Sequence, residues 1–117
     1  LVVTLGTGFG CALFHDGRSL GVFEMGHHPL HKGKTYEERL GKAALKHHGR
    51  KKWSKHLRKA FDTLHDLLYY DRLYIGGGNA SKIKGALPAR ATVIPNELGV
   101  RGGPALWVTK TREDETR

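Results

Sequence analysis

The sequence contains little sulfur chemistry. Cys11 is the only cysteine among 117 residues. A single cysteine forms no internal disulfide and cannot build a cysteine-ligated zinc site. We therefore expect a reducing compartment, the cytoplasm, and no structural zinc.

Long hydrophobic runs are also absent. The apolar runs of this sequence are about as long as single strands, far below the roughly 20 residues that a membrane-spanning helix requires. No stretch has the pattern of a secretory signal peptide. We therefore expect no membrane partner.

Acidic residues are missing from one long stretch. The chain has 20 Lys and Arg against 11 Asp and Glu, a net charge of +9, yet no carboxylate occurs between Arg39 and Phe61. Lys52, Lys55 and Lys59 recur there at helical spacing, where like charges repel unless an anion lies over them. A polyanion would relieve this repulsion, and a solvated helix face in a basic protein is the competing interpretation.

The same stretch carries a helical pattern. Apolar residues fall at helical spacing from about Thr35 until Gly49, and recur at steps of three and four from Trp53 to Leu68. This spacing predicts an amphipathic helix. Trp53 and Phe61 lie on its apolar face, so we expect them in the core rather than as platforms for stacked bases. Nucleic acid is therefore a disfavoured partner.

Two glycine-rich turns follow predicted strands. Residues 4–10 follow the apolar run 1–3, and residues 76–79 follow the apolar run 73–75. Glycine lets the backbone approach a ligand closely, so that N–H groups can face an anion. Either turn alone is more often a tight connection than a phosphate site. Together they suggest one phosphate-bearing ligand held at two points.

The remaining pattern predicts one α/β domain. Strands at 11–14 and 20–23, joined through Asp16 and Gly17, form a β-hairpin. A strand at 72–75, a short helix at about 81–87, a strand at 91–94 and a helix opened by residues 102–104 follow. This order predicts a sheet that is antiparallel at its start and parallel afterwards, with crossover helices. We expect the domain to span residues 1–109, and residues 110–117 to fray.

Three histidines invite a metal interpretation. His27, His28 and His31 lie close together in the sequence. No cysteine supports them as ligands, and a surface histidine cluster is the plainer account. We therefore predict no metal site there.

The ordered set of motifs carries a family resemblance. Residues 1–14, the Glu-x-Gly-His segment at 24–27 and residues 73–79 resemble the C-terminal half of a ROK-family sugar kinase, in the hexokinase and actin-like ATPase superfamily. Residues 35–41 and 51–53 are most similar to the polyphosphate glucokinase branch. The resemblance runs from Leu1 to about Val108 and implies one actin-like ATPase, RNase H-like half-domain.

The resemblance also implies a function. It suggests a phosphotransferase that moves a phosphoryl group from ATP or polyphosphate, with Mg²⁺ on the donor, to the 6-hydroxyl of glucose or a related hexose. It implies that donor, sugar and polyphosphate chain each contact a separate set of residues. These sets are Thr4, Gly6, Thr7, Gly8, Gly76, Gly77, Gly78 and Asn79 for the phosphates or nucleotide; Glu24, His27 and Glu37 for the sugar; and Lys51, Lys52 and Lys55 for the polyphosphate.

The chain departs from the family pattern in two respects. Many members hold a zinc ion with a cysteine cluster, which Cys11 alone cannot provide. The first phosphate loop and the catalytic base, which the resemblance places in an N-terminal domain, have no counterpart in this sequence. We therefore expect a fragment that needs the missing N-terminal domain as a partner and has little activity alone.

A second function remains open at this stage. The chain could instead be a non-catalytic sugar- or nucleotide-binding regulatory domain of ROK type. The sequence leaves the phosphoryl donor, the sugar and the formation of a homodimer undecided.

Overall fold

The computed structural model describes residues 1–94. The expected C-terminal helix at 102–107 and the expected tail at 110–117 lie outside the described residues. The described elements are β1 (Val2–Leu5), β2 (Phe9–His15), β3 (Arg18–Phe23), the 3-10 helix η1 (Met25–His27), β4 (Pro29–His31), β5 (Lys34–Thr35), α1 (Tyr36–Leu40), α2 (Lys42–His48), α3 (Arg50–Leu68), β6 (Leu73–Gly76), the 3-10 helix η2 (Ala80–Lys82) and β7 (Ala91–Val93).

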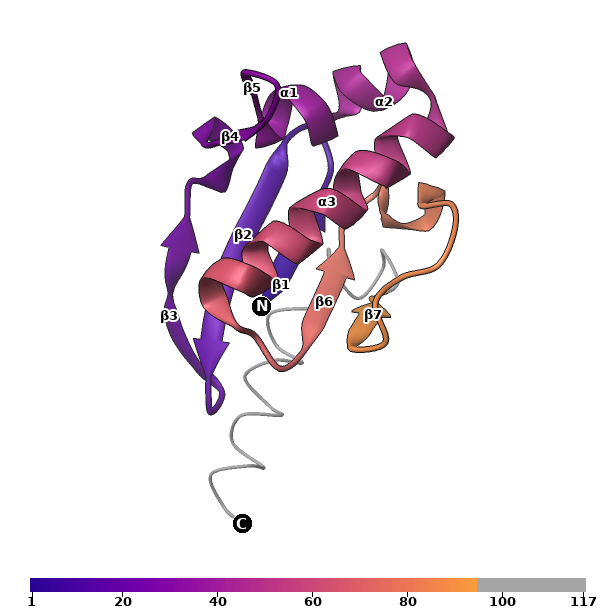
Figure 1. The fold of residues 1–117 in the computed structure, drawn as a ribbon. Coiled ribbons are helices and arrows are strands. Elements are labelled where there is room, and N and C mark those ends of the chain that lie inside the picture. Colours follow the sequence, from indigo (N-terminus) through magenta and orange to yellow (C-terminus); the bar gives the residue numbers. More distant parts are fainter. Residues whose placement is uncertain (95–117) are drawn as a thin grey trace.

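The central sheet has the predicted mixed topology. Its strand order is β3-β2-β1-β6-β7. Figure 1 shows α3 in front of this sheet and α1 at the upper end of the strands. β1 pairs antiparallel with β2 and parallel with β6, and β6 pairs parallel with β7. Because β1 and β6 run in the same direction as neighbours, the turns that follow them meet at one edge of the sheet.

Two hairpins use left-handed backbone positions. Between β2 and β3, Asp16 (φ 49°) and Gly17 (φ 76°) form the predicted reversal, the conformation that favours a two-residue hairpin. Between β4 and β5, Lys32 (φ 50°) and Gly33 (φ 75°) repeat this arrangement. The β4–β5 hairpin was not predicted from the sequence, since its strands are too short to show an alternating pattern.

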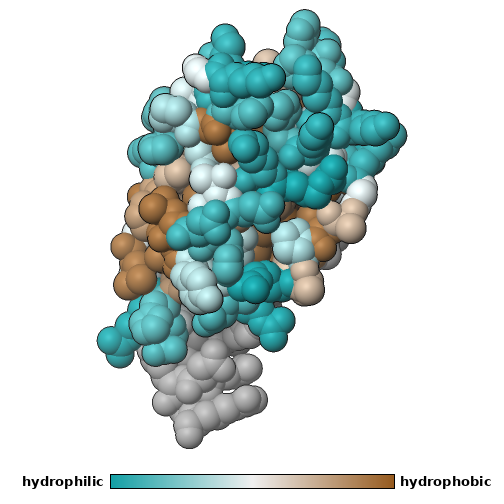
Figure 2. Space-filling view, viewed as in Figure 1, coloured by the Kyte–Doolittle hydropathy of each residue, from teal (hydrophilic) through white to brown (hydrophobic). Residues whose placement is uncertain are grey.

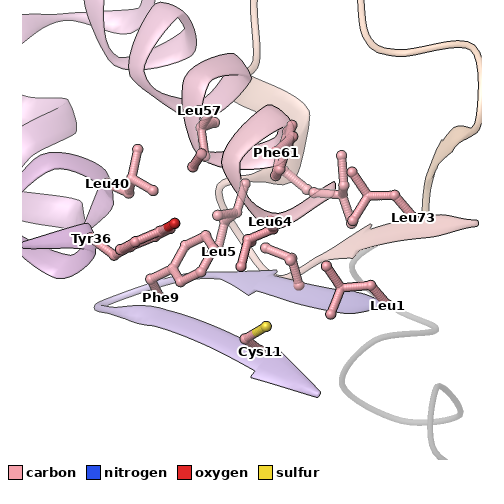
Figure 3. Packing of buried hydrophobic residues seen from close by; sticks show 14 of the residues in the cluster. Leu1, Leu5, Phe9, Cys11, Tyr36, Leu40, Leu57, Phe61, Leu64 and Leu73 are labelled. Atoms are coloured by element: carbon pink, nitrogen blue, oxygen red, sulfur yellow. The ribbon is translucent and has the colours of Figure 1, made fainter. Parts of the chain in front are cut away.

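The core lies between α3 and one face of the sheet. Leu57, Phe61 and Leu64 of α3 point toward the sheet residues Leu5 and Leu73 (Figure 3), and all five side chains are fully buried. Side chains alternate across a strand and repeat every three or four residues along a helix, so each element presents one apolar face. The predicted amphipathic helix is confirmed.

Trp53 occupies the core, as predicted. Its side chain is fully buried, and its indole Nε1 donates a hydrogen bond of 2.9 Å to the Leu40 carbonyl. This bond satisfies the indole and joins α3 to the end of α1. No helix among residues 1–94 is long and apolar enough to cross a membrane.

The helical region before Gly49 consists of two helices. Gly41 has an extended conformation (φ −70°, ψ 173°) that ends α1 and begins α2. A Cβ at Gly41 would lie 2.9 Å from both the Glu37 and Thr7 carbonyls, so only glycine fits this junction without a shift. Gly49, with φ 85°, separates α2 from α3 as predicted.

The prediction of a helix at 81–87 is wrong. Only η2 forms there, and the chain then follows α3 without regular structure. The Lys84 N–H donates to Ser54 Oγ over 2.8 Å, and Arg58 Nη1 donates to the Lys84 carbonyl over 2.8 Å. These tertiary hydrogen bonds take the place of helical ones, and Gly85 (φ 89°) turns the chain away.

Candidate functional site

The two glycine turns are joined directly. The Asn79 N–H donates to the Leu5 carbonyl over 3.0 Å, and Asn79 Nδ2 donates to the Gly6 carbonyl over 3.2 Å. The side-chain amide of Asn79 therefore uses an N–H to hold the turn after β6 against the turn after β1. The structure brings together the two turns that the sequence suggested as one phosphate site.

Gly77 is required by the fold itself. Its φ is 93°, and a Cβ there would overlap the Leu5 carbonyl oxygen and lie 2.7 Å from the Leu5 nitrogen. This position needs both the left-handed conformation and the close approach that glycine permits. The fold alone therefore explains why glycine occupies this position, and Gly77 is not evidence for a ligand.

Gly6, Gly76 and Gly78 differ from Gly77. A Cβ at any of them would meet no atom of residues 1–94 within 4 Å, and none has the positive φ that favours glycine. Neither conformation nor packing of the described residues explains these three glycines. The open space beside them leaves room for a ligand to approach the backbone.

The turn between β1 and β2 presents free N–H groups. The Gly6 N–H donates to the Gly8 carbonyl over 3.2 Å, and the Lys42 N–H donates to the Thr7 carbonyl over 3.1 Å. Within residues 1–94, the N–H groups of Thr7 and Gly8 make no hydrogen bond. Successive free N–H groups in a turn are suited to an anion.

A cavity of about 370 Å³ opens beside this turn. It is lined by residues 4–10, by Gly77 and by Glu37 of α1. A Cβ at Gly8 would lie 2.5 Å from Glu37 Oε1, so the carboxylate faces the glycine turn. A predicted sugar-binding residue and the predicted phosphate-binding residues thus share one cavity.

A capping box sets the position of Glu37. Thr35 N donates to Glu38 Oε1 over 3.0 Å, and Glu38 N donates to Thr35 Oγ1 over 3.2 Å. This reciprocal pair fixes the start of α1, so Glu37, which lies between the two capping residues, projects from a defined first turn. The Thr-x-x-Glu spacing at residues 35–38 is the sequence signal for this arrangement.

The other two predicted sugar residues flank η1. Glu24 precedes η1, His27 ends it, and both side chains are exposed. A Cβ at Gly26 would lie 3.6 Å from Glu37 Cβ, so η1 packs against α1. Glu24 and His27 are not among the residues that line the cavity beside Gly8; they lie on the neighbouring element.

The basic stretch separates into two groups. Arg50 Nε donates to the Lys82 carbonyl over 2.9 Å, and Arg58 donates to Lys84 as described, so these arginines hold the segment after β6. Lys51, Lys52 and Lys55 are exposed on the first half of α3. Figure 2 shows a mostly hydrophilic surface in the upper part of the view, where Figure 1 places α2 and the start of α3.

The lone thiol lies in the core. Cys11 is buried on β2, and this burial raises the pKa of the thiol to about 11. A thiol with so high a pKa remains protonated near neutral pH and is a poor nucleophile and ligand. Among residues 1–94, no group of three His, Cys, Asp or Glu side chains is arranged to hold a metal ion.

The chain is similar in structure to a solved kinase. No protein-family model and no curated protein matches the chain. Among solved structures, the chain is similar to an inorganic polyphosphate/ATP-glucomannokinase from Arthrobacter sp. strain KM, with a TM-score of 0.71 and 27% sequence identity. The likeness covers 94% of this chain and 47% of that chain, so this chain spans about half the length of the kinase. The predicted fold class, an α/β domain of the actin-like ATPase type, is confirmed.

Proposed function

We propose that this chain is the C-terminal, substrate-holding domain of a ROK-type sugar kinase that uses polyphosphate or ATP. One observation carries the proposal: the Glu37 carboxylate faces Gly8 in the cavity lined by the glycine turn. The likeness to a polyphosphate/ATP-glucomannokinase supports the same class of reaction.

The chemistry of the cavity suits phosphoryl transfer to a hydroxyl. A carboxylate accepts hydrogen bonds from sugar hydroxyls, and the free N–H groups of Thr7 and Gly8 are placed to contact the oxygens of a phosphate. Phosphoryl transfer depends chiefly on positioning the two reactants and on stabilising the phosphate charge. Because Glu37 lies beside Gly8, a sugar held by this carboxylate would lie next to the donor.

Other parts of the reaction need further groups. We propose that an N-terminal domain supplies the catalytic base. Mg²⁺ usually binds through one or two carboxylates and the substrate phosphates. Glu37 is the only carboxylate that lines this cavity among the described residues, so we assign the ion to the donor rather than to a protein cage.

The test compares two adjacent carboxylates in the protein that contains this domain together with its phosphate loop and base. Glu37→Gln keeps the side-chain shape but weakens hydrogen bonds from hydroxyl groups. We expect kcat/KM for glucose or mannose to fall. The corresponding loss of transition-state stabilisation is about 1–3 kcal/mol, the scale of a charge-assisted hydrogen bond. Glu38→Gln is the matched control, because glutamine preserves the capping box.

Three outcomes decide between the functions. A selective loss in Glu37→Gln supports the kinase assignment, and equal kinetics in both variants contradict it. Binding of sugar and ATP without any transfer, in a protein that has all the parts named above, would instead favour a regulatory domain.

A further inference from the structure

Three histidines from three elements meet outside the glycine-turn cavity. The ring of His56 on α3 lies 6.0 Å from the ring of His31 on β4 and 6.5 Å from the ring of His48 on α2, measured between centroids. None of the three lines the cavity beside Gly8. The sequence did not reveal this cluster, because its members lie far apart along the chain.

Positive side chains surround the cluster. Arg39 of α1 donates to the His31 carbonyl through Nη2 over 3.3 Å and Nε over 3.4 Å. Among residues 1–94, the charged groups that chiefly act on the three rings are basic. The carboxylate of Glu38, on α1, pairs with Lys34 instead, at 3.7 Å. These basic neighbours are Lys32, Lys55, Lys59 and Arg39 around His31; Lys52, His47 and Arg39 around His48; and Arg39, His31, Lys52 and His48 around His56.

The surroundings of the three rings favour the neutral form over the protonated one. Partial burial is the larger cause that lowers the pKa of His31, His48 and His56 below the ordinary histidine value, and the positive neighbours lower it further. His56 Nε2 is buried and has no hydrogen-bond partner among the described residues. A buried nitrogen without a partner costs free energy. An anion over the cluster would offset the positive field and favour protonation of the rings.

We propose that His31, His48 and His56, with Arg39, Lys52 and Lys55, form a binding site for a chain of phosphate groups whose affinity rises as the rings gain protons. The choice of ligand rests on the proposed function. Several basic groups spread over four elements suit a ligand with repeated negative charge. A base-bearing strand fits less well, because Trp53 and Phe61 are fully buried and cannot stack on bases.

The direct test is an NMR titration of the histidine rings in the 117-residue chain, with and without inorganic polyphosphate. We expect the pKa of His31, His48 and His56 to rise when polyphosphate is present, because the anion stabilises the protonated rings. His15 is the internal control, since it lies on the β2–β3 hairpin next to Asp16, and its ring signals are expected to stay in place when polyphosphate is added. Proton uptake on binding also requires Kd to fall, by about tenfold between pH 8 and pH 6.

Variants test the same site independently. His31→Gln with His48→Gln is expected to remove most of the pH dependence of Kd, while His15→Gln leaves it unchanged. If the double variant unfolds, the titration of the parent chain still decides the question. Unchanged pKa values with polyphosphate would overturn the proposal, as would equal pKa rises with single-stranded DNA of matched charge.

The outcomes also separate this site from the proposed function. If the pKa values rise but the complete protein transfers no phosphoryl group to a sugar, the site stands and the kinase assignment fails. If ATP supports transfer but the pKa values stay constant, the kinase assignment stands and the site fails.

Discussion

Asn79 donates a hydrogen bond from its side-chain amide to the Gly6 carbonyl across 3.2 Å. The two residues are 73 positions apart in the sequence, yet the parallel pairing of β1 with β6 places them side by side. The backbone N–H of Asn79 binds the Leu5 carbonyl as well. Both glycine turns are therefore held as one unit by a residue between the end of β6 and η2.

Replacing Asn79 should loosen this unit. Asn79→Ala removes the bond to Gly6 but keeps the backbone bond to Leu5, so we expect a loss of about 1 kcal/mol in the free energy of unfolding. If the turns bind the donor together, its Kd should rise severalfold. Urea denaturation and donor titration measure the two effects. Asn79→Asp is the companion variant, since a carboxylate cannot donate to Gly6; normal donor binding in both variants would contradict a joint role of the turns.

The glycines of the second turn should respond differently to alanine. Gly77→Ala combines a left-handed backbone with overlap at Leu5, so we expect destabilisation by about 2 kcal/mol or more. Gly78→Ala meets open space and should leave the midpoint of urea denaturation nearly unchanged. A loss of nucleotide affinity in Gly78→Ala, measured by calorimetry, would show that this glycine serves the ligand. Unchanged affinity for both ATP and polyphosphate would show that the space beside it is not used.

Local patterns were sufficient to predict the sheet and the long helix. The alternation of buried Val3 and Leu5 with exposed Thr4 is visible in the sequence, as is the repeat of apolar residues along α3. Such patterns determine which face of an element is buried. The order of strands and helices then restricts the topology. This is why the mixed sheet was predicted correctly.

Contacts between distant segments could not be predicted in the same way. No helix forms over residues 81–87, because Ser54 and Arg58 of α3 hold this segment through hydrogen bonds to Lys84. The residues of 81–87 do not themselves indicate these partners. The histidine cluster depends on the packing of β4, α2 and α3, which spacing within any one element does not report. The candidate site contains features of both kinds. The glycine turns are local motifs that the sequence predicts, whereas the approach of Glu37 to Gly8 depends on the junction at Gly41 and was not predictable from local spacing.

The sugar assignment of Glu24 and His27 remains a prediction. In a protein that joins this domain to the proposed N-terminal domain, Glu24→Gln and His27→Ala should each lower kcat/KM for the sugar. The expected loss of transition-state stabilisation is about 1–3 kcal/mol, through lost hydrogen bonds to hydroxyls. Both side chains are exposed, so thermal stability should change little. His28→Ala is a neighbouring control for His27. Parent-like steady-state kinetics in Glu24→Gln and His27→Ala would leave Glu37 as the sole sugar contact proposed on this chain.

The buried thiol predicts a specific alkaline effect. The folded state holds the pKa of Cys11 at about 11, above the value of about 8.5 for a free thiol. A raised pKa means that the stabilising contribution is complete below the unfolded-state pKa and is lost as pH rises toward 11. Cys11→Ala lacks this ionisation, so the stability difference between parent and variant should shrink by about 2–3 kcal/mol from pH 8 to pH 11. Urea denaturation across this range measures it, and a constant difference would contradict the assignment.

The lysines on α3 offer a graded test of polyphosphate binding. Lys52 and Lys55 act on the histidine cluster, whereas Lys51 is not among the charges that act on it. In a protein that joins this domain to the proposed N-terminal domain, Lys52→Gln and Lys55→Gln should each reduce kcat/KM with long polyphosphate by about twofold, close to the value of an exposed charge contact. Lys51→Gln is expected to have a smaller effect and is the matched control.

The losses should shrink as salt rises, because screening already weakens these contacts in the parent. ATP, which is too short to follow the helix, should support nearly normal rates in all three variants. Equal losses with ATP and polyphosphate would place these lysines at the catalytic cleft, and no loss with either donor would indicate a solvated helix face.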